Sequence, residues 1–287
     1  MKASSIKRRR KKQAAVFWIL RGAAIVNGLA LFVILFFIVV NGISAINWEF
    51  LSEPPRNSMT EGGILPCIVG TFLLSFGSLL VAFPWGVATA IYLSEYAKPG
   101  PWVRFIRLGI NNLAGVPSVV YGLFGLALFV TAMGMGVSLL AGMLTLGAFI
   151  LPLIIGTAEE ALRSVPQTYR EASLGLGATK WQTVYRVVLP AAFPKMLTGM
   201  ILGLSRVAGE TAPIMFTAAV FYTPEMPTSV FSDVMALPYH IYVLATAGTN
   251  IEETRHLQYG TALVLMALVF GMNMFSIWYR SRIQKRT

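Results

Sequence analysis

Apolar residues gather in six long runs along the chain, and polar residues fill the segments between them. A helix needs about 20 largely apolar residues to cross a bilayer, because the hydrocarbon core is about 30 Å thick. Six runs reach this length: roughly Trp18–Ile43, Ile64–Leu93, Leu108–Met133, Val137–Thr157, Ala191–Phe221 and Gly260–Tyr279. Backbone N–H and C=O groups must pair within each segment in hydrocarbon, so the pattern predicts an all-α polytopic protein with six transmembrane helices.

A seventh apolar stretch, Ser229–Gly248, is a poor membrane span. It contains Asp233, Pro238 and His240, and a crossing there would put the basic C-terminus on the opposite side from the N-terminus. We expect this stretch to be an amphipathic or re-entrant piece within an outer loop, 223–258.

Positive charge is distributed unevenly around the predicted helices. Only Arg56 and Arg255 lie on the outer side, where they accompany seven acidic residues. Of the 23 Lys and Arg residues, 20 fall on the other side, in the N-terminal region up to Arg21, the segments 98–107 and 163–195, and the tail from Arg280. Loops rich in Lys and Arg stay in the cytoplasm, so both termini are predicted to be cytoplasmic, with a basic segment 1–16 and a basic tail 281–287.

Composition excludes several other classes of protein. Hydrophobic residues make up 56% and charged residues 12% of the 287 residues, whereas soluble domains carry roughly 25% charged residues. The net charge of +11 is explained by the topology, so it gives no support to nucleic-acid binding. The single cysteine, Cys67, excludes an intrachain disulfide framework, and with only two histidines we expect no metal site.

The long cytoplasmic segment between the fourth and fifth predicted spans, 158–190, has the pattern of two short helices. Pro166 suits the first turn of a helix, and Gly175 and Gly177 end that helix. A second amphipathic segment, Lys180–Val188, follows before Pro190 opens the next span. We expect a rigid knob that fits a groove on a partner protein.

The fifth predicted span carries two charged residues, Arg206 and Glu210. At 100° per residue they share one face with Gly199 and Gly203, which allow a neighbouring helix to approach closely. A charge deep in a membrane costs several kcal/mol unless it is paired, and it marks a transport path by default. Two interpretations stay open: the pair neutralises itself one helical turn apart, or Arg206 binds an oxyanion through its fork of N–H donors while Glu210 holds the guanidinium in place.

The cytoplasmic knob resembles the EAA loop of ABC-transporter permease subunits. That family pattern is Glu-Ala-Ala, three residues, Gly, nine residues, then Ile-x-Leu-Pro. This chain has Glu171-Ala172-Ser173, then Gly177, then Val187-Val188-Leu189-Pro190 at the same spacing, with Ser173 and Val187 as conservative departures. The resemblance implies a type I ABC importer permease of the MetI-like fold, in which Glu171, Ala172, Gly177, Leu189 and Pro190 couple the spans to a separate ATPase subunit.

Two further stretches are similar to phosphate-import permeases, and most similar to their PstA-type subunit. They are Arg206-Val-Ala-Gly-Glu210-Thr211-Ala-Pro213 and Gly115-Val-Pro117-Ser118-Val-Val-Tyr121-Gly-Leu-Phe-Gly125. The resemblance implies a substrate path through Arg206, Glu210 and Thr211. The resemblance runs from about Ile64 to Arg280, so we expect a permease core over 64–280, preceded by the first helix and an outer loop over 17–63.

The same resemblance implies partners and a location. The partners are a PstC-type second permease, a PstB-type ATP-binding dimer and a PstS-type extracytoplasmic phosphate-binding protein, all at a bacterial plasma membrane. The chain contains no Gly-Lys dipeptide and therefore no Walker A sequence, so we expect no cofactor and no catalytic residue here, with ATP and Mg²⁺ bound by the ATPase subunit.

Three alternatives remain open from the sequence. An ABC permease for molybdate or sulfate would use the same arginine chemistry, because these anions are also tetrahedral. A proton- or sodium-driven carrier and a pore-forming structural subunit are rivals of another class, although neither needs a knob for an ATPase.

Overall fold

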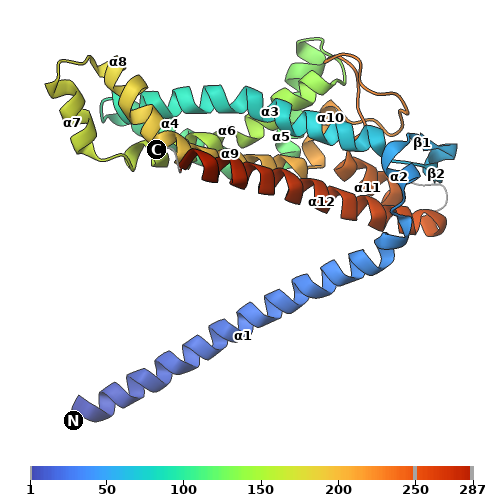
Figure 1. Ribbon diagram of the computed structural model, residues 1–287, viewed down its shortest axis with the longest axis horizontal. Coiled ribbons are helices and arrows are strands. Elements are labelled where there is room, and N and C mark those ends of the chain that lie inside the picture. Colours follow the sequence, from blue (N-terminus) through green and yellow to red (C-terminus); the bar gives the residue numbers. More distant parts are fainter. Residues whose placement is uncertain (1, 248–250, 285–287) are drawn as a thin grey trace.

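Five apolar runs form helices of membrane-spanning length in the computed structural model (Figure 1). The structure describes residues 2–247 and 251–284. The five helices are α1 (Lys2–Gly42), α3 (Leu65–Ile91), α6 (Leu139–Arg163), α9 (Leu189–Ala208) and α12 (Ile251–Gln284). Residues 248–250 of the predicted outer loop, 285–287 of the predicted tail, and the side chains of the basic run 7–12 lie outside the described part.

The third predicted span is not one straight helix. The chain forms α4 (Pro101–Ala114), then α5 (Ser118–Gly125), which continues as a π-helical segment, η4 (Leu126–Ala132). The two parts are bent by 101° at the break, so the prediction of a single helix over Leu108–Met133 is wrong. Pro117 explains the break, because proline donates no backbone hydrogen bond and disfavours the α conformation in the residue before it. Counting this bent pair as one broken span gives six candidate spans.

The fifth predicted span is also interrupted. Helix α9 ends at Ala208, and a separate short helix, α10 (Ala212–Thr217), follows after three residues. The prediction of one helix over Ala191–Phe221 is therefore wrong. Pro213 in the first turn of α10 fits a helix start better than a helix interior.

Helices α3, α6 and α9 form the centre of the bundle. Glycines allow their close packing: a side chain at Gly86 of α3 would meet Ile154 of α6 at 2.6 Å, and one at Gly199 of α9 would collide with Thr157. Gly203 likewise faces Ile154. The expectation that Gly199 and Gly203 allow close helix approach is confirmed, with α6 as the neighbour.

Helix α1 crosses away from the bundle and meets it only near its C-terminal end (Figure 1). There Gly42 packs on the backbone of Tyr259 and Gly260 of α12. None of the apolar window of α1 is buried within this chain. An apolar helix that makes few contacts within its own chain is stable in a bilayer, where lipid or a partner subunit covers its surface.

Short elements close the end of the bundle where the outer loop is predicted. Helix α11 (Leu237–Thr246) has ten residues, too few to span, which agrees with the expectation for Ser229–Gly248. The loop before α11 covers the start of α6, whose Leu139 N–H donates to the Ser232 carbonyl at 2.8 Å. The remaining elements there are η1 (Ile43–Ala45), α2 (Trp48–Ser52), the antiparallel strands β1 (Pro55–Arg56) and β2 (Glu61–Gly62), and η2 (Asn57–Met59) between them.

The opposite end carries the predicted cytoplasmic knob. It consists of α7 (Gln167–Gly175), α8 (Lys180–Thr183) and the π-helical segment η5 (Val184–Val188), beside η3 (Tyr92–Tyr96) at the end of α3. The early turns of α1 and the last turns of α12 both lie toward this end (Figure 1). This arrangement agrees with two termini on the side of the knob, and the predicted all-α polytopic fold is confirmed.

Candidate functional site

The knob is a helix pair joined by a tight turn at Gly177. Helix α7 ends in a Schellman motif: the Gly177 N–H donates to the Leu174 carbonyl at 2.9 Å, and the Ala178 N–H donates to the Ser173 carbonyl at 3.2 Å. Gly177 has φ +86°, a left-handed conformation that glycine adopts without strain. The Thr179 hydroxyl then caps α8 in a reciprocal pair with Gln182.

The outer surface of the knob is open. The predicted coupling residues Glu171 and Ala172 are exposed on α7. Two large apolar side chains of the knob are also exposed, Leu176 at 90% and Trp181 at 62%. Large apolar side chains held exposed on a rigid knob are typical of an interaction surface. The other two predicted coupling residues, Leu189 and Pro190, form the first turn of α9, where the knob joins the span.

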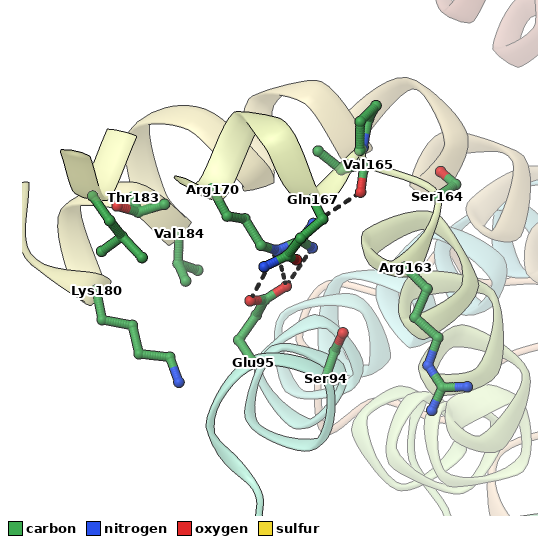
Figure 2. Close-up of a pocket in the computed structure, with 12 residues that line it drawn as sticks. Ser94, Glu95, Arg163, Ser164, Val165, Gln167, Arg170, Lys180, Thr183 and Val184 are labelled. Carbon is green, nitrogen blue, oxygen red and sulfur yellow. Dashed lines mark hydrogen bonds and ion pairs between the residues drawn. The ribbon is translucent and has the colours of Figure 1, made fainter. Parts of the chain in front are cut away.

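A cavity of about 690 Å³ separates the knob from the end of α3 (Figure 2). One ion pair crosses it: Arg170 of α7 binds Glu95 of η3, with 2.6 Å between Nη2 and Oε1. The side chains of Glu95 and Arg170 are only 8% and 14% exposed. The same guanidinium donates to the backbone carbonyls of Leu162 and Val165.

Arg206, the first predicted substrate-path residue, lies near the end of α9 and is exposed on the surface of this chain. Its guanidinium carbon is 4.4 Å from the centroid of the Phe149 ring of α6. Phe149 packs edge-on against Tyr121 of α5, with 5.4 Å between ring centroids. An arginine over an aromatic face is held by a cation–π interaction and keeps its N–H donors free around its edge.

Glu210 does not hold Arg206 in the predicted way. Because α9 ends at Ala208, Glu210 lies in the break and not one helical turn further along the same face. The ion pairs of the described residues do not include Arg206 with Glu210, although the two are close enough to interact electrostatically. Instead, the Ser118 side chain lies beside the Glu210 carboxylate. The predicted pairing of Arg206 with Glu210 along one helix face is therefore wrong.

The structure brings the two signature stretches together. A side chain at Gly122 of α5 would meet the ring of Phe216, the Ala212 carbonyl and the Pro213 backbone within 3.0 Å, so α5 and α10 touch through their backbones. The helix breaks at 115–117 and 209–211 thus lie close together, with Ser118 beside Glu210. Thr211, the third predicted residue, is half-buried in this junction.

Sequence reasoning missed the partners of these residues. Glu95, Phe149 and Ser118 received no role, although each contacts a charged residue of interest. One signal was present for Glu95: it is one of only four acidic residues on a side of the chain that is rich in Lys and Arg. Within the described residues, no group of three His, Cys, Asp or Glu side chains is placed to hold a metal ion.

Comparison with known proteins identifies curated relatives over most of the chain. It is 34% identical over 262 residues to the probable ABC transporter permease protein YqgI of Bacillus subtilis, covering 87% of this chain and 88% of that protein. It is 36% identical over 255 residues to the phosphate transport system permease protein PstA of Mycobacterium leprae, covering 87% of this chain and 82% of that protein.

Solved ABC transporters share the fold. The chain aligns with the MetNI methionine ABC transporter at TM-score 0.62 and 19% identity, over 77% of this chain and 95% of that one. It aligns with a bacterial alginate ABC transporter, solved in complex with a periplasmic protein, at TM-score 0.64 and 13% identity, over 96% of both chains. The expected type I importer permease fold is therefore confirmed. The family model of the binding-protein-dependent transport system inner membrane component matches residues 82–287, and the chain belongs to this family of ABC transporter permeases.

Proposed function

We propose that this chain is the transmembrane permease subunit of an ATP-driven importer of inorganic phosphate. The observation that carries the proposal is the junction of α5 and α9–α10, where the exposed Arg206 lies near the Glu210 carboxylate and the Ser118 side chain. Relatives named as phosphate transport permeases support phosphate over molybdate or sulfate as the substrate. We assign residues 64–280 to the permease core, with residues 17–63 as an additional helix and outer loop.

Arg206 provides the attraction for the anion. Its guanidinium rests on the Phe149 ring and is not consumed by an ion pair among the described residues. Guanidinium N–H groups match two phosphate oxygens in a fork geometry. Phosphate loses part of its hydration shell when it enters an apolar region. The guanidinium contact replaces part of that hydration, so phosphate can bind weakly in the middle of the membrane.

Glu210 supplies a means of discrimination between oxyanions. An ionised carboxylate only accepts hydrogen bonds, and phosphate near neutral pH carries at least one O–H group that can donate. Sulfate and molybdate are fully deprotonated there, so they would face Glu210 with repulsion and no hydrogen bond. The Ser118 side chain lies beside the Glu210 carboxylate, close to Arg206, and is placed to orient this acceptor.

The knob supplies the coupling to ATP hydrolysis. Glu171, Ala172 and Gly177 present an exposed surface for an ATPase subunit, and Leu189 and Pro190 connect that surface to α9. A PstB-type dimer would bind ATP and Mg²⁺, and its closure would shift the spans between inward- and outward-open states. A PstC-type permease would complete the path, and a PstS-type protein would deliver phosphate at the outer face of a bacterial plasma membrane.

Reconstitution tests this function. The complete transporter is placed in proteoliposomes with its binding protein, and uptake of radiolabelled phosphate is measured with ATP present or absent. We expect ATP-dependent uptake that tenfold excess sulfate or molybdate does not reduce. Uptake suppressed by one competitor would reassign the substrate to that anion, and uptake driven by an ion gradient without ATP would favour a secondary carrier.

The Glu210→Gln variant tests the basis of selectivity in the same vesicles. The amide keeps the size of the side chain but adds two donors, so sulfate gains a partner. We expect sulfate to compete measurably in this variant. Unchanged discrimination would remove Glu210 from selectivity and leave the remainder of the proposal intact.

A further inference from the structure

We propose that Arg170 and Glu95 form a clamp that fixes the knob to α3 and α6, and that Arg170 is therefore a positioning residue for coupling. This inference rests on the proposed function, because it concerns how ATPase-driven motion reaches the spans. Arg170 itself lies on α7 immediately before the exposed Glu171, and its side chain points into the cavity behind the knob, toward Glu95 (Figure 2).

Most N–H donors of the Arg170 guanidinium have a hydrogen-bond acceptor. Nε lies 3.2 and 3.3 Å from the two carboxylate oxygens of Glu95, and Nη2 lies 2.6 Å from Oε1. Nη2 also donates to the Leu162 carbonyl at 3.0 Å, and Nη1 donates to the Val165 carbonyl at 2.8 Å. A buried charge with this many partners holds one geometry, because any movement of the guanidinium leaves another buried group unpaired.

The partners of Arg170 come from three different elements. Glu95 lies at the cytoplasmic end of the α3 span, Leu162 lies in the last turn of α6, and Val165 lies in the loop that leads to α7. The Leu162 carbonyl in the last turn of α6 accepts from the Val165 N–H at 3.2 Å, and the Arg170 guanidinium supplies a second donor there, so it also helps to cap α6. One side chain thus joins the ATPase-facing knob to two core spans.

Helix α6 then leads from the clamp to the substrate path. Phe149, which supports Arg206, lies on α6 about 20 Å along the helix axis from Leu162, at 1.5 Å per residue. Pro152 lies between these two residues and removes one hydrogen bond of the helix, but α6 is packed along its side by α3 and α9, which hold the two parts together. Displacement of the knob is therefore expected to move α6 and the Phe149 ring under Arg206.

Arg163 offers a matched control in the same cavity. It also binds a glutamate, Glu159, at 2.6 Å, but its side chain is 56% exposed and bonds no backbone carbonyl in the described part of the chain. Lysine keeps a point charge but cannot form a planar fork. Arg170→Lys therefore removes the multiple bonds of the clamp. Arg163→Lys retains the simple charge contact of an exposed side chain, and Glu159 keeps its second partner, Arg107, at 2.6 Å.

The experiment measures phosphate moved per ATP hydrolysed in proteoliposomes that contain the complete transporter. Wild type, Arg170→Lys, Glu95→Gln and Arg163→Lys are compared, with co-purification of the ATPase subunit as the measure of assembly. We expect Arg170→Lys and Glu95→Gln to assemble and hydrolyse ATP while phosphate per ATP falls at least fivefold. Arg163→Lys is expected to stay within twofold of wild type.

Two results would overturn the clamp. Normal phosphate per ATP in both Arg170→Lys and Glu95→Gln would show that the ion pair is dispensable for coupling. Failure of both variants to assemble would make the pair a requirement for folding and not for coupling. Absence of ATP-driven phosphate uptake in the wild type would instead refute the proposed function, so the two failures are distinguishable.

Discussion

Substitution of Gly177 by alanine isolates the effect of one backbone conformation on coupling. Gly177 has φ +86°, and a Cβ added there would have no neighbour within 4 Å. Alanine therefore brings no steric clash, only the cost of the left-handed conformation, about 1–2 kcal/mol. The Schellman turn that joins α7 to α8 is destabilised by that amount.

This cost sets the expected weakening of ATPase binding. If the partner binds only the native turn, 1–2 kcal/mol reduces the apparent affinity by a factor of about 5–30 as an upper limit. Valine at the same position is expected to reduce the affinity further, because β-branched residues rarely adopt a positive φ. Asparagine tolerates this conformation and is expected to recover part of the loss.

Gly175→Ala is the control for this prediction. Gly175 also has open space around its Cβ position, but it ends α7 without a positive φ. Alanine is favoured there by helix propensity. Titration of the ATPase subunit against the purified permease pair gives the affinities. Equal affinities for Gly177→Ala and Gly175→Ala would refute the idea that the left-handed turn is needed for docking.

Two other predictions concern stability and are tested on the purified protein. Gly199→Ala is expected to lower the free energy of unfolding by about 1–3 kcal/mol, because the new methyl group collides with Thr157. Gly156→Ala, which has open space and gains helix propensity, is expected not to lower the melting temperature. His240, in α11 outside the spans, is buried without a partner for Nδ1, and burial lowers its pKa from 6.5 to about 4. Folding favours the neutral imidazole, so the free energy of unfolding has its full value above pH 6.5. It falls as the pH drops, by about 2 kcal/mol at pH 5. Melting curves at pH 7.5 and 5 are expected to converge in His240→Leu; an equal pH effect in that variant would contradict the assignment.

The positions of the spans could be predicted from the sequence, but their interruptions could not. An apolar window reports only that a segment prefers lipid, and Leu108–Met133 contains enough apolar residues to meet this test across a bend of 101°. Pro117 and Pro213 were visible as positions where helices can kink. Whether a helix breaks at these prolines depends on tertiary packing. The close approach of α10 to α5 at Gly122 exists only in the folded bundle.

The candidate site shows the same limit. The types and spacing of Arg206 and Glu210 indicated a charged site within the fifth span. Their partners could not be predicted, because Phe149 and Ser118 lie on other helices and a helical wheel treats each span alone. The Arg170–Glu95 pair joins residues 75 positions apart in the chain, which no local pattern reports.

Phosphate uptake by Arg206 variants tests the central claim most directly. The assay compares radiolabelled phosphate uptake by wild type, Arg206→Lys and Arg206→Ala at matched membrane levels, with co-purification of the ATPase subunit as the control for assembly. Because the guanidinium is the proposed anion contact, we predict that Arg206→Ala assembles but loses at least 90% of uptake, as expected for a charge-assisted contact worth about 1.5–3 kcal/mol. Arg206→Lys, which keeps the charge but not the fork, is predicted to retain an intermediate rate. Undiminished uptake in an assembled Arg206→Ala transporter would contradict a substrate path through Arg206.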